Sequence, residues 1–188
     1  MTAFGNKFRR LVDILLFFAY NMPEGGVSMY TADLIAKWFL RKDLIVSRMG
    51  DSEGISNLKL QKLLYYAQGV YCGMVGSPLF RDELVAWTHG PVVESVYHAY
   101  KSFGSIPISI EDTEGLTKED TENLEAIDDE TVGILEMVYE AFGQFSAWKL
   151  REMSHQDSPW IETEQGWPIS VEAIKKCFLE KYLVEGEE

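Results

Sequence analysis

Hydrophobic residues recur at three- and four-residue steps along most of the chain, the spacing that places side chains on one face of an α-helix. The clearest stripe begins after Ser56 or Asn57 and stops at Gly76 and Pro78. Its members are Leu60, Leu63, Leu64, Ala67, Val70, Tyr71 and Met74. Gly69 interrupts the stripe, where glycine disfavours a helix by about 1 kcal/mol relative to alanine, so we expect it to allow close packing of another helix.

The same periodicity predicts helices on both sides of this segment. One is expected from Phe8 to Ala19, before Pro23. Other helices are expected to start after residues that cap helix N-termini, namely Thr31, Thr117, Ser146 and Ser170. Another is expected to start at Asp128, Asp129 and Glu130, where the helix macrodipole favours negative charge. Asp120 lies three residues after Thr117, so this pair is expected to form a capping box.

Two short segments have strand character instead. Glu83–Thr88 contains Leu84, Val85 and Trp87, and Ser105–Ile110 alternates weakly between apolar and polar residues. Pro91 suits the first turn of a helix, so the segment after Gly90 is expected to be helical, with Val93, Val96, Tyr97 and Tyr100 buried. The predicted fold class is mainly α, a compact multi-helix domain with one or two short β segments.

Charge is distributed unevenly. The 188 residues carry a net charge of −13, which argues against a nucleic-acid partner because Lys and Arg supply most of the affinity for phosphate backbones. Residues 1–60 have a net charge of +2 and the remainder −15, and Glu111–Glu130 contains ten acidic residues and only Lys118 as a base. This acidic segment is either a solvated surface or a surface complementary to a basic partner.

The cysteines and histidines do not indicate a metal or a cofactor. Cys72 and Cys177 form no CxxC pair, and we expect both to be reduced, with Cys72 buried. His89, His98 and His155 lack metal-ligand spacing, and no Ser or Cys lies in a recognisable nucleophile motif. An enzyme is therefore not expected.

The apolar run from Leu11 to Tyr20 is not a membrane segment. It contains Asp13 and is far shorter than the roughly 20 residues that span a bilayer. No small-residue cleavage site follows it, so a signal peptide is not indicated either. We expect a cytoplasmic protein with no membrane partner.

Several separated motifs occur in the order found in one known family. The most specific is the run Leu60–Gly69 (LQKLLYYAQG), followed by Pro78-Leu79-Phe80, Ala86-Trp87 and Gly90-Pro91-Val92-Val93. The later run Ser154–Trp160 (SHQDSPW) is similar to a His-x-x-x-Pro-Trp element, with Ser154 where threonine is more usual. Together these motifs resemble the Panacea domain, the SocA-like antitoxin family that includes the phage-associated GepA proteins.

The resemblance implies an antitoxin of a bacterial or prophage toxin–antitoxin system. Such a protein neutralises a protein toxin by direct binding, without a cofactor or catalysis. The SocA likeness also leaves open a proteolytic adaptor, which would deliver a bound toxin to an AAA+ Clp-type protease. A third and weaker alternative is a small hydrolase or nucleotide-binding protein that uses His89, His155 and Asp157.

Candidate partner-binding residues come from the same motifs. They are Lys62, Gln68, Trp87, His89, Gly90, Pro91, Val92, His155 and Trp160. Lys62 and Gln68 lie off the apolar stripe, so they are read either as contacts or as solvated residues. Trp87 and Trp160 are either interface anchors or core, and His89 and His155 either form a polar network or are structural. N–H groups after Gly90-Pro91 offer a weak anion site if a helix begins there.

The resemblance begins at Tyr30, which suggests three divisions of the chain. These are an N-terminal extension (residues 1–28), a Panacea-like antitoxin domain (29–184) and an acidic tail (185–188). Glu24-Gly25-Gly26 can be encoded by a purine-rich sequence similar to a ribosome-binding site, so Met29 is a candidate native start. Intact-mass analysis of the natural protein tests this hypothesis, and a full-length mass would reject it.

Overall fold

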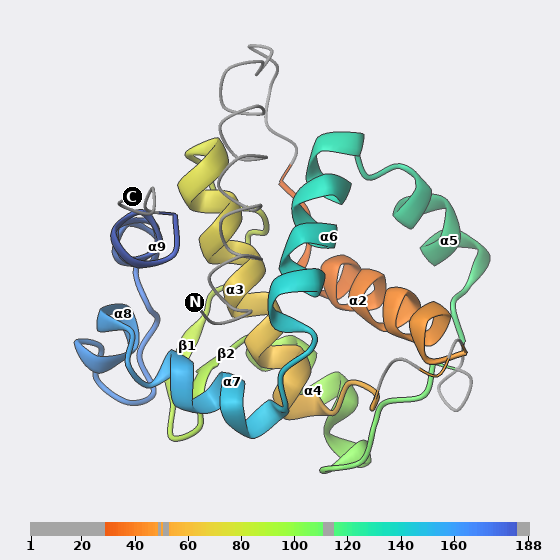
Figure 1. Cartoon of the computed structure of the whole chain (residues 1–188), viewed down its shortest axis with the longest axis horizontal. Helices are drawn as coiled ribbons and strands as arrows, with labels where there is room; N and C mark the ends of the chain where they lie inside the picture. Colours follow the sequence, from red (N-terminus) through yellow and green to blue (C-terminus); the bar gives the residue numbers. More distant parts are fainter. Residues whose placement is uncertain (1–28, 49, 51–52, 111–114, 184–188) are drawn as a thin grey trace, which may run out of the picture.

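Helix α3 (Asn57–Val75) runs through the middle of the molecule, and the other elements surround it (Figure 1). The computed structural model describes residues 29–48, 50, 53–110 and 115–183. Helix α9 (Val171–Lys181) lies on one side of α3, and α6 (Asp129–Phe142) and α2 (Ala32–Ser47) lie on the other side. The mainly α fold class is therefore confirmed.

Residues are buried around the whole circumference of α3. The expected start is confirmed, since the Ser56 side chain accepts a hydrogen bond from the Lys59 N–H, and Gly76 ends the helix in the left-handed region at φ 88°. Asn57 and every residue from 59 to 72 are buried. The apolar stripe is thus real, but polar side chains outside it also face neighbouring elements.

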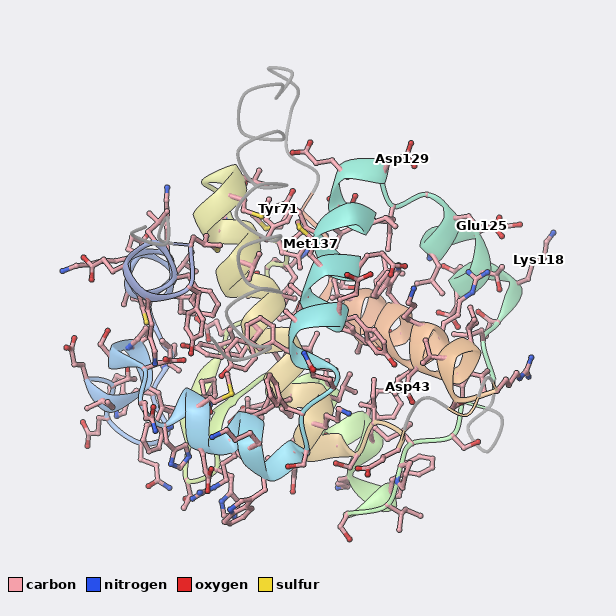
Figure 2. All side chains as sticks on the ribbon, in the orientation of Figure 1. Asp43, Tyr71, Lys118, Glu125, Asp129 and Met137 are labelled. Carbon is pink, nitrogen blue, oxygen red and sulfur yellow. The ribbon has the colours of Figure 1, made fainter. Side chains whose placement is uncertain are left out.

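Gly69 permits the contact between α3 and α9. A Cβ atom added at Gly69 would lie 2.2 Å from the ring of Phe178. Phe178 belongs to a buried aromatic cluster in which Tyr66 stacks on Phe142 with their ring centroids 4.1 Å apart. The expectation that this glycine allows close helix packing is confirmed. Figure 2 shows Tyr71 and Met137 where α3 and α6 face each other.

The capping residues start helices where the sequence predicts them. Thr31, Asp128, Ser146 and Ser170 cap α2, α6, α7 (Ala147–Ser154) and α9. Thr117 and Asp120 form the expected capping box of α5 (Lys118–Glu125). The shorter helices are α4 (Glu94–Tyr100), the 3₁₀ helix η1 (Lys101–Phe103) and α8 (Ser158–Ile161).

The strands form a small antiparallel hairpin. Strand β1 (Val85–Trp87) confirms the first predicted strand, but β2 is Gly90–Val92, so the helix expected after Gly90 is wrong there. Pro91 pairs with Ala86, whose N–H and C=O instead bond to Trp167 and Gly166. Pro91 therefore occupies a position of the ladder that needs no N–H.

The segment Ser105–Ile110 does not form the second strand that its alternation suggested. It contributes an isolated bridge between Pro107 and Ser56, together with a hydrogen bond from the Ile108 N–H to the carbonyl of Ile55. A helix begins after Val93, and within that helix Val96 and Tyr100 are buried as predicted.

The expected helix from Phe8 to Ala19 and the tail at 185–188 lie outside the described residues, as does residue 184 of the expected domain. The proposed start at Met29 therefore stays a prediction. Over the part of the chain that the structure describes, no helix is long and apolar enough to cross a membrane. Cys72 and Cys177 are buried, free thiols.

Candidate functional site

A groove of about 770 Å³ lies beside the hairpin. Its walls come from the hairpin, the start of α3, helix α4, the end of η1 and the 165–166 loop. The aromatic, charged and polar side chains of its lining include Trp87, His89, Tyr97, Lys101 and Gln165. The rings of Trp87 and Tyr97 meet edge to face with centroids 4.9 Å apart. This geometry gives the groove a rigid aromatic wall.

Lys62 of α3 is completely buried, and its side chain contacts the hairpin. Its Nζ donates a hydrogen bond to the Pro91 carbonyl at 2.7 Å. Burial, followed by repulsion from Arg151, lowers the Lys62 pKa to about 7. Both surface interpretations of Lys62 are therefore wrong: its side chain faces the inner strand of the hairpin and cannot meet a partner in this conformation.

Gly90 is required where α3, α7 and the hairpin meet. Its φ of +95° lies in the left-handed region, and a Cβ atom there would lie 2.7 Å from Lys62 Nζ and 2.8 Å from Ser154 Oγ. The predicted binding residues Gly90, Pro91 and Val92 are all buried. No helix begins at Gly90, so the anion site considered for that position is wrong.

Gln68 also faces inward, with 2% of its surface exposed. Its Oε1 accepts hydrogen bonds from the N–H groups of Leu79 and Phe80, at 3.0 and 3.2 Å, and its Nε2 donates to the Phe80 carbonyl at 3.2 Å. Gln68 therefore holds the loop after α3, and the surface interpretations of this residue are wrong as well.

Two further side-chain amides of α3, those of Gln61 and Asn57, form hydrogen bonds with the backbone around the groove. Gln61 accepts from the Val93 N–H at 2.9 Å and donates to Asn57 Oδ1 at 3.2 Å. Asn57 in turn donates to the Tyr97 carbonyl at 3.0 Å. The sequence reasoning missed these residues. The available signal was polar residues in a helix whose other positions are apolar or aromatic, a pattern that fits buried hydrogen-bonding groups.

Trp87, His89, His155 and Trp160 come together around the hairpin. Trp160 Nε1 donates to the Trp87 carbonyl at 2.9 Å, and His155 stacks on Trp160 with centroids 3.8 Å apart. His89 is exposed, whereas both tryptophans and His155 are half-buried. Burial lowers the His155 pKa, with further contributions from the charges of Arg151, Lys62 and His89.

Asp157 belongs to a different network. It is fully buried and accepts hydrogen bonds from Tyr65 at 3.0 Å and Tyr182 at 2.9 Å, and it forms an ion pair with Lys181. These contacts join α3, α8 and α9, and they occupy the carboxylate that an acid–base role with His155 would need. In the described ranges, no group of three or more His, Cys, Asp or Glu residues could hold a metal ion.

The described part of the acidic segment lies on α5 and at the start of α6, away from the hairpin. Glu119, Glu122, Glu125 and Asp129 are exposed, while Asp120 is held by Lys37 at 2.7 Å. Figure 2 shows Lys118, Glu125 and Asp129 along this outer edge of the molecule. The segment is thus a surface separate from the groove.

Comparison with known proteins identifies relatives of this chain. The family model described as "Antitoxin SocA-like, Panacea domain" matches residues 60–161, which includes most of α3, the hairpin and the helices through α8. No solved structure matches.

A curated relative, Antitoxin SocA of Caulobacter vibrioides (strain NA1000 / CB15N), is 46% identical over 50 residues. The aligned stretch covers 27% of this chain and 27% of the relative, so the chain matches about a quarter of that protein's length.

Proposed function

This chain belongs to the Antitoxin SocA-like, Panacea domain family, and we propose on that basis that it is an antitoxin that binds a protein toxin directly and holds it inactive. The family match over residues 60–161 carries the proposal, because it covers the central helix and the hairpin around which the domain is built. The likeness to Antitoxin SocA points the same way.

The chemistry of the described residues supports a binding role over catalysis. Lys62, Gln68 and Asp157, three of the buried polar residues of the motifs, are used in hydrogen bonds or ion pairs that hold elements together. The predicted partner-binding residues that are exposed or half-buried are Trp87, His89, His155 and Trp160. Tryptophan is enriched among the residues that dominate protein–protein binding. We propose that these four residues belong to the partner-binding surface, in a cytoplasmic protein of a bacterium or prophage.

The first test is affinity capture of the tagged protein from its native host, followed by mass spectrometry. A stoichiometric small protein encoded next to the gene would support the antitoxin proposal and identify the toxin. That protein must also arrest growth when it is expressed alone, and co-expression of this chain must restore growth. Growth arrest that this chain does not relieve would reject the proposal.

Direct neutralisation differs from proteolytic delivery in its need for a protease. With direct binding, growth rescue persists in a host that lacks the Clp-type protease, and toxin abundance is unchanged by this chain. Rescue that disappears with the protease, together with toxin that accumulates, would instead support the adaptor alternative. Toxin abundance should therefore be measured in both hosts.

A further inference from the structure

We propose that the groove beside the hairpin binds a segment of the partner protein that carries an aromatic side chain next to a carboxylate. This inference rests on the proposed function, because it names the chemistry of the toxin segment that the domain recognises. It is motivated by a difference in charge between the lining of the groove and the rest of the molecule.

The described residues that line the groove carry no carboxylate although the protein is strongly acidic, and the neighbouring Glu94 carboxylate is bonded to Trp87 Nε1. The chain has 30 acidic residues and a net charge of −13, yet none of the described residues that line the groove is Asp or Glu. The lining contains Lys101, which is exposed and has no ion pair among the described residues. The local charge of the groove therefore favours an anionic group.

His89 and Lys101 add hydrogen-bond donors to the groove. Arg151 Nε donates to Nδ1 of His89 at 3.2 Å, so a neutral His89 ring carries its proton on Nε2 and can donate to a partner. Trp87 Nε1 already donates to Glu94 at 3.1 Å. Lys101 and His89 thus offer donors from two different elements, and a partner carboxylate has the oxygens to accept them.

The interior of the groove suits an apolar side chain. Asn57 and Gln61 hydrogen bond to each other and to the backbone of Tyr97 and Val93. Gln165 likewise donates to the hydroxyl of Thr88. These polar groups are paired with one another or with the backbone, and the aromatic wall of Trp87 and Tyr97 matches the composition of protein-interface anchors.

The test uses the full chain and three blocked, fluorescein-labelled peptides of equal length. The first contains a phenylalanine flanked by aspartates, the second replaces the aspartates with lysines, and the third replaces the phenylalanine with serine. Fluorescence anisotropy is expected to show saturable binding of the first peptide alone, weakened by added salt. Absence of saturable binding at about 1 mM, or equal binding of the lysine peptide, would overturn the proposal.

Variants locate the binding to the groove. Lys101→Glu is expected to weaken binding of the aspartate–phenylalanine peptide by about tenfold, because it puts a like charge beside the aspartates. Lys176→Glu makes the same charge change at an exposed position of α9 outside the groove and is expected to change affinity by less than about twofold. Equal effects of the two variants would contradict the proposal.

A Trp87→Ala variant tests the aromatic wall, with a thermal unfolding curve to show that the domain remains folded. We expect at least about a tenfold loss of peptide affinity. If Trp87→Ala unfolds the domain, Lys101→Glu still decides the question, because Lys101 is exposed.

Growth rescue separates this inference from the proposed function. If Lys101→Glu rescues growth as well as the natural protein, the groove is not the toxin-binding site although the antitoxin proposal stands. If the natural protein itself fails to rescue growth, the antitoxin proposal fails whatever the peptides do.

Discussion

At the scale of single residues, the polar side chains of the family motif act inside the protein. Lys62 carries an ammonium group that bonds to the Pro91 carbonyl and is repelled by Arg151. Removing an ammonium from water is costly, and one neutral carbonyl does not offset that cost. The pKa of Lys62 consequently falls to about 7.

This shift predicts that stability rises with pH above neutrality. Between the folded pKa of about 7 and the ordinary lysine pKa of 10.5, the unfolded chain binds more protons at Lys62 than the folded chain does. The free energy of unfolding should therefore increase between pH 7 and pH 9, by at most about 1.4 kcal/mol per pH unit. Urea unfolding at pH 7, 8 and 9 measures the slope.

The pH window has an upper limit, and a variant provides the control. Burial raises the pKa of Cys72 from 9.0 to about 11, so its contribution lowers stability above pH 9. Lys62→Met removes the titrating group at similar length and should flatten the slope between pH 7 and pH 9. A slope that survives in Lys62→Met would show that another group causes it.

Gln68 provides a second test at the residue scale. Gln68→Met keeps a similar side-chain volume but leaves the N–H groups of Leu79 and Phe80 and the Phe80 carbonyl without their partner. We expect a loss of at least about 3 kcal/mol in the free energy of unfolding, since three groups lose their partner and each unpaired buried group costs about 1–3 kcal/mol. Gln165→Met, at an exposed amide, is the control and should change stability by less than about 0.5 kcal/mol.

At the scale of elements, the close approach of α3 and α9 positions the core of the domain. Gly69 of α3 lies against Phe178 of α9. Tyr65 of α3 and Tyr182 at the end of α9 both donate hydrogen bonds to Asp157. The sequence predicted close packing at this glycine, but it did not identify α9 as the helix that packs there. Helical periodicity identifies which face is apolar and contains no information on which other face covers it.

Two glycine substitutions separate helix propensity from packing. Gly69→Ala and Gly133→Ala both gain up to about 1 kcal/mol of intrinsic helix propensity. The new Cβ of Gly69→Ala would meet the Phe178 ring at 2.2 Å, whereas nothing lies within 4 Å at Gly133. We therefore expect Gly69→Ala to destabilise the domain by about 1–3 kcal/mol and Gly133→Ala to stabilise it slightly. Chemical denaturation of both variants provides the comparison, and a stabilised Gly69→Ala variant would contradict the packing argument.

At the scale of the whole molecule, the exposed residues Glu119, Glu122, Glu125 and Asp129 form an acidic edge. This acidic edge and the groove are distinct surfaces. We propose that exposed carboxylates of α5 raise the association rate with a basic toxin by long-range attraction, while the groove provides local recognition. Both can operate on one toxin if its basic surface and its acidic, aromatic segment lie on different parts of that protein.

Charge reversal tests the acidic edge with the captured toxin. Replacing Glu119, Glu122 and Glu125 with lysine is expected to lower the association rate by about tenfold or more at low salt and to reduce its salt dependence. The control replaces the exposed Glu152, Glu162 and Glu180 with lysine, which gives the same net charge away from α5. Surface plasmon resonance at several salt concentrations gives both rates. Equal rates for the two variants would show that net charge alone is responsible, and unchanged affinity and salt dependence would reject the acidic edge.

The sequence by itself determined where most helices begin and which family the chain belongs to. Helix starts at Thr31, Ser56, Thr117, Asp128, Ser146 and Ser170 follow from side chains that bond to the nearby backbone, and such short-range hydrogen bonds are visible in the order of residues. The motifs between Leu60 and Trp160 likewise indicated the family that the comparisons identified.

Only the tertiary structure decided which polar residues face inward and where the groove lies. Lys62 and Gln68 lie off the apolar stripe of α3 and were expected at the surface, yet the hairpin and the 79–80 loop cover them. The missing N–H of Pro91 suits the first turn of a helix, which is the structure that the sequence predicted. Pro91 lies in β2 because its ladder partner Ala86 bonds to Trp167 and so needs no N–H from Pro91. These outcomes depend on contacts between residues far apart in the chain, and hydrophobic periodicity describes one segment at a time.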